Sequence, residues 1–350
     1  MDQVTPTPPI FDGHNDAVLR LWQGGAAGVA DRFRADPAGQ IDLQSTRKGG
    51  FVGGFFALFA PPGGDFRMPG FIPPYDIPLP PRMDQPEALR IVTAQLGILA
   101  ELDRKGLLSI CRDRAEIDAA IAAGRLAALV HMEGAEAIDG ELHALEAFYA
   151  AGLRSLGPVW SRPTIFGHGV PFRYPSDGDT GPGLTALGKA LVARCAELGI
   201  VVDTSHLNMA GFDDVAAAGL PLVATHSNAH AVSPGARNLT DPQLRAIGQT
   251  AGMVGLNFGT MFLREDGHAA PEGGLQAAVR HLGHMIETAG EDHVGIGSDF
   301  DGAPMPQSLQ SAGDLDNLRN AMRSHQFGEA LIAKICSGNW LAFLGRVLGP

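Results

Sequence analysis

Histidine and carboxylate side chains end five short apolar runs of this chain. The runs close with the pair His14 and Asp16, with Glu133, with His206, with His226 and with Asp299. Short runs of this kind, rich in β-branched residues, are typical of buried parallel strands. Histidine, aspartate and glutamate are also the side chains that bind zinc and similar divalent ions. The pattern therefore predicts strands whose ends bring a set of metal ligands together.

The number of these side chains favours two metal ions over one. His14 and Asp16 point to the same side of an extended strand, although such a pair alone is also typical of a packed histidine beside a capping aspartate. A catalytic zinc needs about three protein ligands and an open position, and this set is larger. Two ions about 3.5–4 Å apart, sharing a carboxylate and a hydroxide that attacks a carbonyl, fit the count better.

Glu133 is the expected bridge between the two ions. A carboxylate at the end of an apolar strand is costly to bury unless it is paired or bound to metal. A carbamylated lysine is the alternative bridge, but no strand-like run ends in any of the four lysines, which are Lys48, Lys105, Lys189 and Lys334. We expect His131 to be a hydrogen-bonded core histidine and Asp203 to be structural. Ser205 and Ser227 could hydrogen-bond the ligands beside them.

The segments that carry these residues alternate between strand-like and helix-like patterns. Helical patterns cover residues 85–105, 115–123, 141–151, 185–198, 208–218, 241–248, 274–289 and 314–322. About eight strands separated by helices predict a (β/α)8 TIM-like barrel of the metal-dependent hydrolase type, in which catalytic groups collect at the strand C-termini. A Rossmann fold is disfavoured because no Gly-x-Gly-x-x-Gly opens a helix after a strand.

We expect residues 1–350 to form a single catalytic barrel domain with two long loops. The segment 61–86 holds nine prolines, which suits either a surface insertion or a loop that covers the substrate. The segment 157–182 is rich in glycine, proline and polar residues, and it too follows a strand-like run.

The charge and the composition of the chain exclude several classes of partner and of structural framework. The net charge of −12 and the pI of about 5.4 argue against nucleic acid and anionic membranes. Three widely spaced cysteines disfavour a disulfide framework and a zinc ribbon, and Cys195 is expected in the core. Neither a signal peptide nor an apolar run of about 20 residues is evident, so the simplest expectation is a cytoplasmic protein without a membrane anchor, although a chain trimmed of its leader would look the same.

Taken together, these motifs closely resemble the membrane (renal) dipeptidase family of zinc metallopeptidases. The matching stretches occur in the family's order and are Asp12-Gly13-His14-Asn15-Asp16, Glu133-Gly134, Ser205-His206, Thr225-His226-Ser227-Asn228-Ala229, Arg237-Asn238 and Gly297-Ser298-Asp299-Phe300-Asp301-Gly302. The resemblance implies a distorted (β/α)8 barrel with two Zn²⁺ per chain. It assigns His14, Asp16 and Glu133 to one ion, and Glu133, His206 and His226 to the other.

The resemblance also implies roles for residues that hold no metal. Asp299 is similar to the family's proton-handling carboxylate, and Arg237 to the residue that binds the terminal carboxylate of the substrate, which a guanidinium fork fits bidentately. Family members often carry a carbonyl-binding histidine where this chain has Trp160. His168, in the same loop, could take its place, so both are candidates for substrate binding. No C-terminal anchor signal is evident, as in the soluble bacterial-type members.

The expected function is a zinc-dependent dipeptidase that attacks the peptide bond of a dipeptide with a metal-bridging hydroxide. The resemblance also allows a D-residue on the C-terminal side and β-lactam-like amides. The alternative enzyme is an amidohydrolase or lactonase that uses the same binuclear site on N-acyl amino acids or lactones. A non-catalytic binding barrel would be signalled by a lost ligand or a lost Asp299, and neither is lost. The oligomeric state stays open, with a homodimer among the options.

Overall fold

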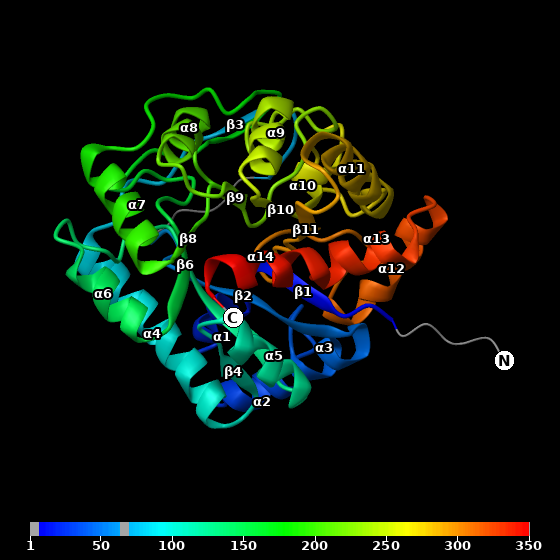
Figure 1. Cartoon of the computed structure of the whole chain (residues 1–350), viewed down its shortest axis with the longest axis horizontal. Helices are drawn as coiled ribbons and strands as arrows, with labels where there is room; N and C mark the ends of the chain where they lie inside the picture. The colour runs from blue at the N-terminus through cyan, green and yellow to red at the C-terminus, as the bar shows by residue number, and fades with distance from the viewer. Residues whose placement is uncertain (1–6, 64–69, 350) are drawn as a thin grey trace.

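The computed structural model describes residues 7–63 and 70–349. Its parallel strands form one sheet that curls into a nearly closed barrel, with helices on the outside (Figure 1). The strands of this sheet are β1 (Ile10–Asn15), β2 (Phe51–Phe59), β4 (Leu108–Ile110), β5 (Leu126–Glu133), β6 (Leu153–Gly157), β8 (Val201–Val202), β9 (Val223–Ala224), β10 (Met253–Leu256) and β11 (Val294–Ile296).

The order of the strands shows how the barrel closes. Neighbours pair in the order β8-β6-β5-β2-β1-β11-β10-β9, and β4 pairs with β5 outside this path. A parallel bridge between Asp203 and Val223 then joins the chain just after β8 to β9, at the two ends of the order. The prediction of a TIM-like barrel is therefore confirmed.

The helices of the structure include every predicted one, with ends within two residues of the expected positions. They are α1 (Ala17–Gln23), α2 (Val29–Arg34), α3 (Leu43–Gly49), α4 (Gln85–Arg104), α5 (Arg114–Ala122), α6 (His143–Ala150), α7 (Ala186–Leu198), α8 (Met209–Ala217), α9 (Asp241–Gln249), α10 (Thr260–Leu263), α11 (Gly274–Ala289), α12 (Leu315–Ser324), α13 (Glu329–Ala333) and α14 (Asn339–Val347). The helices α1, α2, α3, α10, α13 and α14 were not predicted, and the first five of these are too short for a hydrophobic period to show. Within the described ranges, no helix combines the length and the apolar character needed to cross a bilayer.

Helix α14 closes the end of the barrel at which the strands begin (Figure 1). Its Trp340 is fully buried and donates a hydrogen bond from Nε1 to the carbonyl of Ile296, at 2.8 Å. Gly13 and Gly295 leave room for the indole, since a Cβ on either would lie 2.7 Å or less from a ring atom. Apolar side chains from six strands fill the barrel around it, and these are Phe11, Phe55, Leu129, Val201, Val223 and Met253. The polar residues at the C-terminal ends of the strands therefore lie at the opposite end of the barrel.

The two long loops meet above that opposite end. The strand β3 (Tyr75–Ile77) of the proline-rich segment pairs antiparallel with β7 (Phe172–Tyr174) of the segment 157–182. Phe71 and Phe172 from these loops pack edge to face, with ring centroids 5.9 Å apart. Part of the proline-rich segment, residues 64–69, lies outside the described residues. The described parts of both loops contribute side chains to the cavity over the strand ends.

Candidate metal centre

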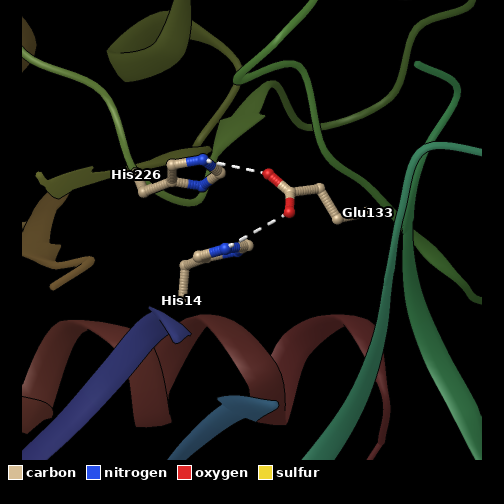
Figure 2. Close-up of side chains that lie close together, drawn as sticks. All are labelled: His14, Glu133 and His226. Carbon is tan, nitrogen blue, oxygen red and sulfur yellow. Dashed lines mark ion pairs between the residues drawn. The ribbon is translucent and has the colours of Figure 1, made fainter. Parts of the chain in front are cut away.

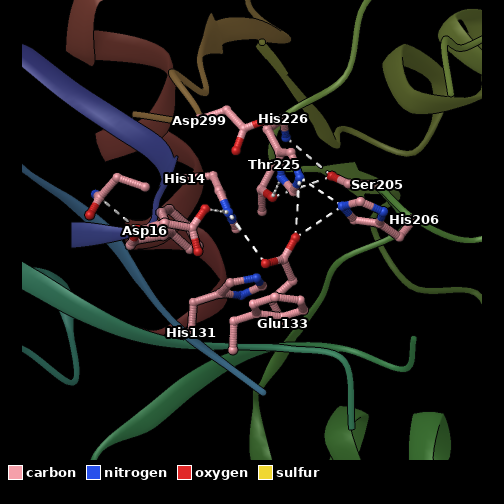
Figure 3. A network of polar contacts seen from close by, with 12 residues as sticks. His14, Asp16, His131, Glu133, Ser205, His206, Thr225, His226 and Asp299 are labelled. Carbon is pink, nitrogen blue, oxygen red and sulfur yellow. Dashed lines mark hydrogen bonds and ion pairs between the residues drawn. The ribbon is translucent and has the colours of Figure 1, made fainter. Parts of the chain in front are cut away.

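The strand ends bring the predicted ligands into one buried cluster (Figure 3). His14 lies in β1 and Asp16 directly follows this strand, while Glu133 is the last residue of β5. His206, His226 and Asp299 follow β8, β9 and β11. Parallel strands thus deliver side chains that are far apart in the sequence to the same end of the barrel.

Glu133 lies between two groups of ligands (Figure 2). Its Oε2 is 3.8 Å from Nε2 of His14. Its Oε1 is 2.9 Å from Nε2 of His206 and 3.6 Å from Nε2 of His226. On the first side, Nε2 of His14 is also 3.4 Å from Oδ2 of Asp16. One oxygen therefore faces the pair His14 and Asp16, and the other faces the two remaining histidines, which is the arrangement expected of a bridging carboxylate.

Two sets of ligand atoms are each compact enough to surround a single ion. The atoms of His14, Glu133 and His226 lie within 4.8 Å of one another, and so do those of His14, Asp16 and Asp299. Asp299 is thus within reach of a metal as well as of the cavity. Gly302 makes this approach possible, since a Cβ there would lie 2.2 Å from Oδ2 of Asp16 and 2.5 Å from Oδ1 of Asp299.

The charges of the cluster suit a bound cation. Burial raises the pKa of Glu133 well above its ordinary value, so an isolated carboxylate here would be costly. Burial alone would lower the pKa of His14, but the adjacent Glu133 and Asp16 outweigh it and raise this pKa to about 10. The carboxylates of the cluster therefore favour a positive charge at this place, which a bound divalent ion would supply.

The buried polar atoms also fit a divalent metal. Within residues 7–63 and 70–349, both ring nitrogens of His14 and Oδ1 of Asp16 are buried without a hydrogen-bond partner. Burial lowers the pKa of His206 and His226 well below the usual value, which leaves neutral rings with free lone pairs. Their Nε2 atoms face each other at 3.1 Å. Unsatisfied buried atoms are rare unless a ligand or ion completes them, so the residues present form a metal site.

Hydroxyl groups orient the two facing histidines. Ser161 Oγ lies 3.0 Å from Nδ1 of His206, and Thr225 Oγ1 lies 2.8 Å from Nδ1 of His226. Such contacts fix the ring and the tautomer of a metal-binding histidine. The expected partner Ser205 instead accepts a hydrogen bond from the backbone N–H of His226, at 3.1 Å. The expected kind of contact is therefore present, but Ser161 and Thr225 make it, and Ser227 instead accepts a hydrogen bond from Arg237 at 2.9 Å.

His131 and Asp203 lie beside the cluster and make hydrogen bonds of the kind expected of structural residues, although Nε2 of His131 is buried without a partner among the described residues. His131 Nδ1 contacts Ser155 Oγ at 2.9 Å, and burial lowers the pKa of this histidine to about 3, so the ring is neutral. Asp203 accepts hydrogen bonds from the backbone N–H groups of Ser205 and Thr225, at 3.0 and 2.9 Å. These bonds hold the chain after β8 against the chain after β9, and with it the two ligand histidines.

Asp12 and Asn257 are two supporting residues to which the sequence analysis gave no role. Asp12 accepts hydrogen bonds from the backbone N–H and the hydroxyl of Ser298, at 2.7 and 2.8 Å, and so ties the strand of His14 to the residue before Asp299. Asn257 donates from Nδ2 to Oδ2 of Asp299 at 2.8 Å. Asp301 does not join the cluster, since its Oδ1 instead accepts a hydrogen bond from the backbone N–H of Gln40 at 2.8 Å.

Arg237 presents a buried positive charge beside the metal cluster. Its guanidinium donates to Ser227 Oγ at 2.9 Å and to the carbonyl of His226 at 3.2 Å, and its Nε has no hydrogen-bond partner within residues 7–63 and 70–349. Among the residues that the structure describes, no carboxylate lies against it at ion-pair distance. Burial lowers the pKa of Arg237 to about 10, so it stays protonated at neutral pH. A buried charge without a counter-ion indicates a site for an anion.

A cavity of about 410 Å³ joins Arg237 to the metal cluster. Asp16, Glu133, His206 and Asp299 line it together with apolar side chains, which are Leu19, Phe59, Phe71, Trp160, Phe172, Met261 and Phe262. Trp160 therefore stands in the wall of this cavity. His168 lines a separate pocket with Asp76 and Arg173, and its Nδ1 contacts the carbonyl of Gly183 at 3.3 Å. This position does not support the expectation that His168 binds the substrate carbonyl.

Comparisons with known proteins find matches both in sequence and in fold. The family model described as membrane dipeptidase (peptidase family M19) matches residues 1–348. The solved structure of dipeptidase AC, a family M19 metallopeptidase, is 50% identical, with a TM-score of 0.95 over 98% of this chain and 100% of that one. A metallopeptidase from Rhodobacter sphaeroides, liganded with a phosphinate mimic of L-Ala-D-Ala, is 49% identical, with a TM-score of 0.94 over 97% and 99%. An uncharacterized protein from the pqqA 5′ region of Klebsiella pneumoniae is 44% identical over 264 residues, 75% of this chain and 97% of that protein.

The fold and the site define a metal-dependent hydrolase built on a TIM-like barrel. Within that class, the chain belongs to the membrane dipeptidase family, peptidase family M19, and is a metallo-dipeptidase.

Proposed function

We propose that this metallo-dipeptidase holds two zinc ions and hydrolyses free dipeptides, including those with a D-residue on the C-terminal side. The observation that carries the proposal is the protonated, buried Arg237 that shares a cavity with the metal cluster. The dipeptide mimic bound to the relative from Rhodobacter sphaeroides supports both the substrate length and the D-residue. A cavity of about 410 Å³ is also of the size that encloses a small ligand.

Each residue of the cluster has a distinct task in this proposal. His14, Asp16 and Glu133 would hold one ion, and Glu133, His206 and His226 the other. When bound, the ions lower the pKa of a water molecule and polarise the scissile carbonyl. Asp299, with one oxygen held by Asn257, would accept the proton of the attacking water and pass it to the leaving amine.

Arg237 would fix the register of the substrate. Two of its nitrogens are already anchored to Ser227 and to the carbonyl of His226, so the guanidinium has a set orientation. Its remaining N–H groups can grip a carboxylate bidentately. Because the carbonyl of His226 is one of the anchors, the clamp stands at a defined position relative to the metal ligands. A free α-carboxylate on Arg237 would then place the adjacent peptide bond over the metal centre.

Free dipeptides are therefore expected to be far better substrates than their C-terminal amides or longer peptides. Leaving a buried, hydrogen-bonded charge without its partner costs about 2–5 kcal/mol, roughly 30- to 5000-fold in kcat/KM. Arg237→Ala should raise KM for free dipeptides and narrow their advantage over the amides. Arg237→Lys should restore only part of it, since an ammonium group lacks the planar fork. Steady-state kinetics with matched pairs of free and amidated dipeptides measures both effects.

Equal cleavage of free and amidated dipeptides by the wild-type enzyme would show that Arg237 is not the carboxylate clamp. The amidohydrolase or lactonase alternative would then gain ground. The apolar cavity wall of Phe59, Trp160 and Phe172 is the observation that favours it, because an acyl chain would find contacts there. A panel of N-acyl amino acids and lactones beside the dipeptides separates the two activities.

The purified enzyme is expected to carry about two zinc ions per chain. Chelation should abolish hydrolysis and lower the melting temperature, since the buried carboxylates lose their counter-ions and binding energy that stabilises the folded state is removed. Added zinc should restore both. Elemental analysis and thermal unfolding give the two readouts, and full activity with one tightly held ion would contradict the binuclear site.

A further inference from the structure

A buried ion pair lies behind the cavity wall, outside the metal cluster. Arg162 donates from Nε to Oε1 of Glu136 at 2.7 Å, and each side chain is only 1% exposed. The same guanidinium donates from Nη2 to the carbonyl of Ala60 at 2.6 Å. Among the described residues, those that line the cavity include neither of the two, and the hydrogen bonds of Arg162 go to Glu136 and Ala60. A pair this deeply buried is costly to desolvate and is not by itself a reason for high stability, so its position invites a functional explanation.

Arg162 joins the ends of three strands that form the active site. Its contact with Ala60 reaches the end of β2, its partner Glu136 follows β5, and Arg162 itself lies in the loop after β6. The guanidinium carbon also lies 6.0 Å from the ring centroid of Phe59 and 5.9 Å from that of Trp160. Both rings line the cavity, with centroids 5.3 Å apart. The cation thus supports this part of the aromatic wall from behind.

Three consecutive residues connect the pair to the metal centre. Trp160 forms the wall, Ser161 contacts Nδ1 of His206 at 3.0 Å, and Arg162 holds the ion pair. The Trp160 ring also lies 5.9 Å from the ring of His206. A shift of Arg162 would therefore move both the wall and the hydroxyl that orients His206.

The same pair also packs against the residue after the bridging carboxylate. Gly134 has a φ of 80°, and a Cβ there would lie 2.3 Å from Oε2 of Glu136 and 3.1 Å from the backbone nitrogen of Trp160. The backbone that follows Glu133 thus passes directly over the ion pair. Any larger residue at position 134 would be strained in this conformation and would also displace the pair.

We propose that Arg162 and Glu136 are positioning residues, whose ion pair fixes the Trp160-Ser161 segment and thereby the His206 side of the metal centre and the aromatic wall of the substrate cavity. Only the expected effect on substrate binding rests on the proposed dipeptidase function. The expected effect on zinc affinity depends on the metal cluster alone, so the two expectations can fail separately.

The test replaces the pair by apolar side chains of similar volume, as Glu136→Met with Arg162→Met. Such replacements of buried ion pairs are often neutral for stability, which separates positioning from folding. We expect the affinity for the zinc ion on the His206 side, measured by chelator competition, to fall by about 10–100-fold, the usual effect of losing a group that orients a ligand. KM for free dipeptides should rise about tenfold, because the aromatic wall is displaced, while the change in melting temperature stays small.

A double-mutant cycle locates the effect on His206. In a His206→Ala background, removal of the pair should leave the affinity of the remaining ion unchanged, because the contact through Ser161 is already lost. Arg162→Lys keeps the charge but not the fork that also reaches Ala60, and should recover part of the affinity. If the double replacement does not fold, Arg162→Lys alone tests the proposal through the same measurement of zinc affinity.

Arg319 offers a matched control at the opposite end of the barrel. It is fully buried and donates to the carbonyls of Pro8 and Gly49, at 3.0 and 2.8 Å, just before β1 and β2. Arg319→Met should lower stability without changing zinc affinity or KM. If the Glu136 and Arg162 variants behave in the same way, the pair is purely structural and the proposal is wrong. Loss of zinc affinity in an enzyme inactive on every dipeptide would keep the positioning role and reject the substrate assignment.

Discussion

Glu133→Gln is expected to weaken both halves of the metal centre at once, and hydrolysis should fall to background. One oxygen of this carboxylate faces His14, at 3.8 Å from its Nε2, and the other is 2.9 Å from Nε2 of His206. An amide keeps the shape but loses the negative charge, and one of its two ends becomes an N–H donor that cannot bind a cation. The loss of affinity for each ion should exceed the roughly 10–100-fold that follows removal of an outer hydrogen-bonding partner.

The measurement compares the zinc content of three variants by elemental analysis and chelator competition. His206→Ala should release mainly one ion, because His206 approaches only Oε1 of Glu133 and so belongs to one side of the cluster. Glu141→Gln, an exposed position in the segment that follows β5, should behave as wild type and controls for the change of charge. Loss of a single ion in Glu133→Gln, with the other held at wild-type affinity, would show that the carboxylate does not bridge.

The candidate metal ligands could be predicted from the sequence because each stands at or just beyond the end of a strand-like run. Glu133 closes an eight-residue strand, and His226 comes two residues after the two-residue strand β9. The position of a histidine or carboxylate at the end of an apolar run was therefore enough for the prediction, even where the strand is short. In the structure, Asp16 lies just past β1 instead of within it, yet it still reaches His14.

Of the two contacts that support the cluster from outside, one could not be predicted from the sequence and the other could have been. Ser161 reaches His206 from the loop after β6, and this approach depends on how the loop folds back over the barrel. No local period or spacing encodes such a contact. Asn257, by contrast, directly follows β10 and holds Asp299. The rule that found the ligands, a polar residue at a strand end, applies to it as well.

The structure of the two long loops could also be predicted only in part. Their composition predicted irregular segments on the active-site side, but not the antiparallel pairing of β3 with β7 that joins them. That pairing links residues about a hundred positions apart, and short irregular strands carry little periodicity. Phe172, which is part of this pairing, lies in the cavity wall, whereas His168 of the same loop lines another pocket.

Asp299→Asn should slow turnover by about 10²–10⁴-fold, the usual contribution of a positioned proton carrier, while metal content and fold are preserved. The backbone of Asp299 is left-handed, with a φ of 58°. Asparagine tolerates this conformation nearly as well as aspartate does, whereas alanine would add strain. The substituted side chain can still accept the hydrogen bond from Asn257 through its oxygen, but it cannot take up a proton. The expected loss therefore lies in kcat, with KM for free dipeptides little changed.

The zinc content of the Asp299→Asn variant decides between two roles that the geometry permits. Ligand atoms of His14, Asp16 and Asp299 lie within 4.8 Å of one another, so Asp299 is close enough to bind the ion on the side of His14 and Asp16. Its Oδ2 is already engaged by Asn257, which leaves Oδ1 to face the cluster. If Asp299 carries protons, two ions remain and turnover alone falls. If the variant loses an ion, and excess zinc restores its activity, Asp299 is a ligand and another group must move the proton.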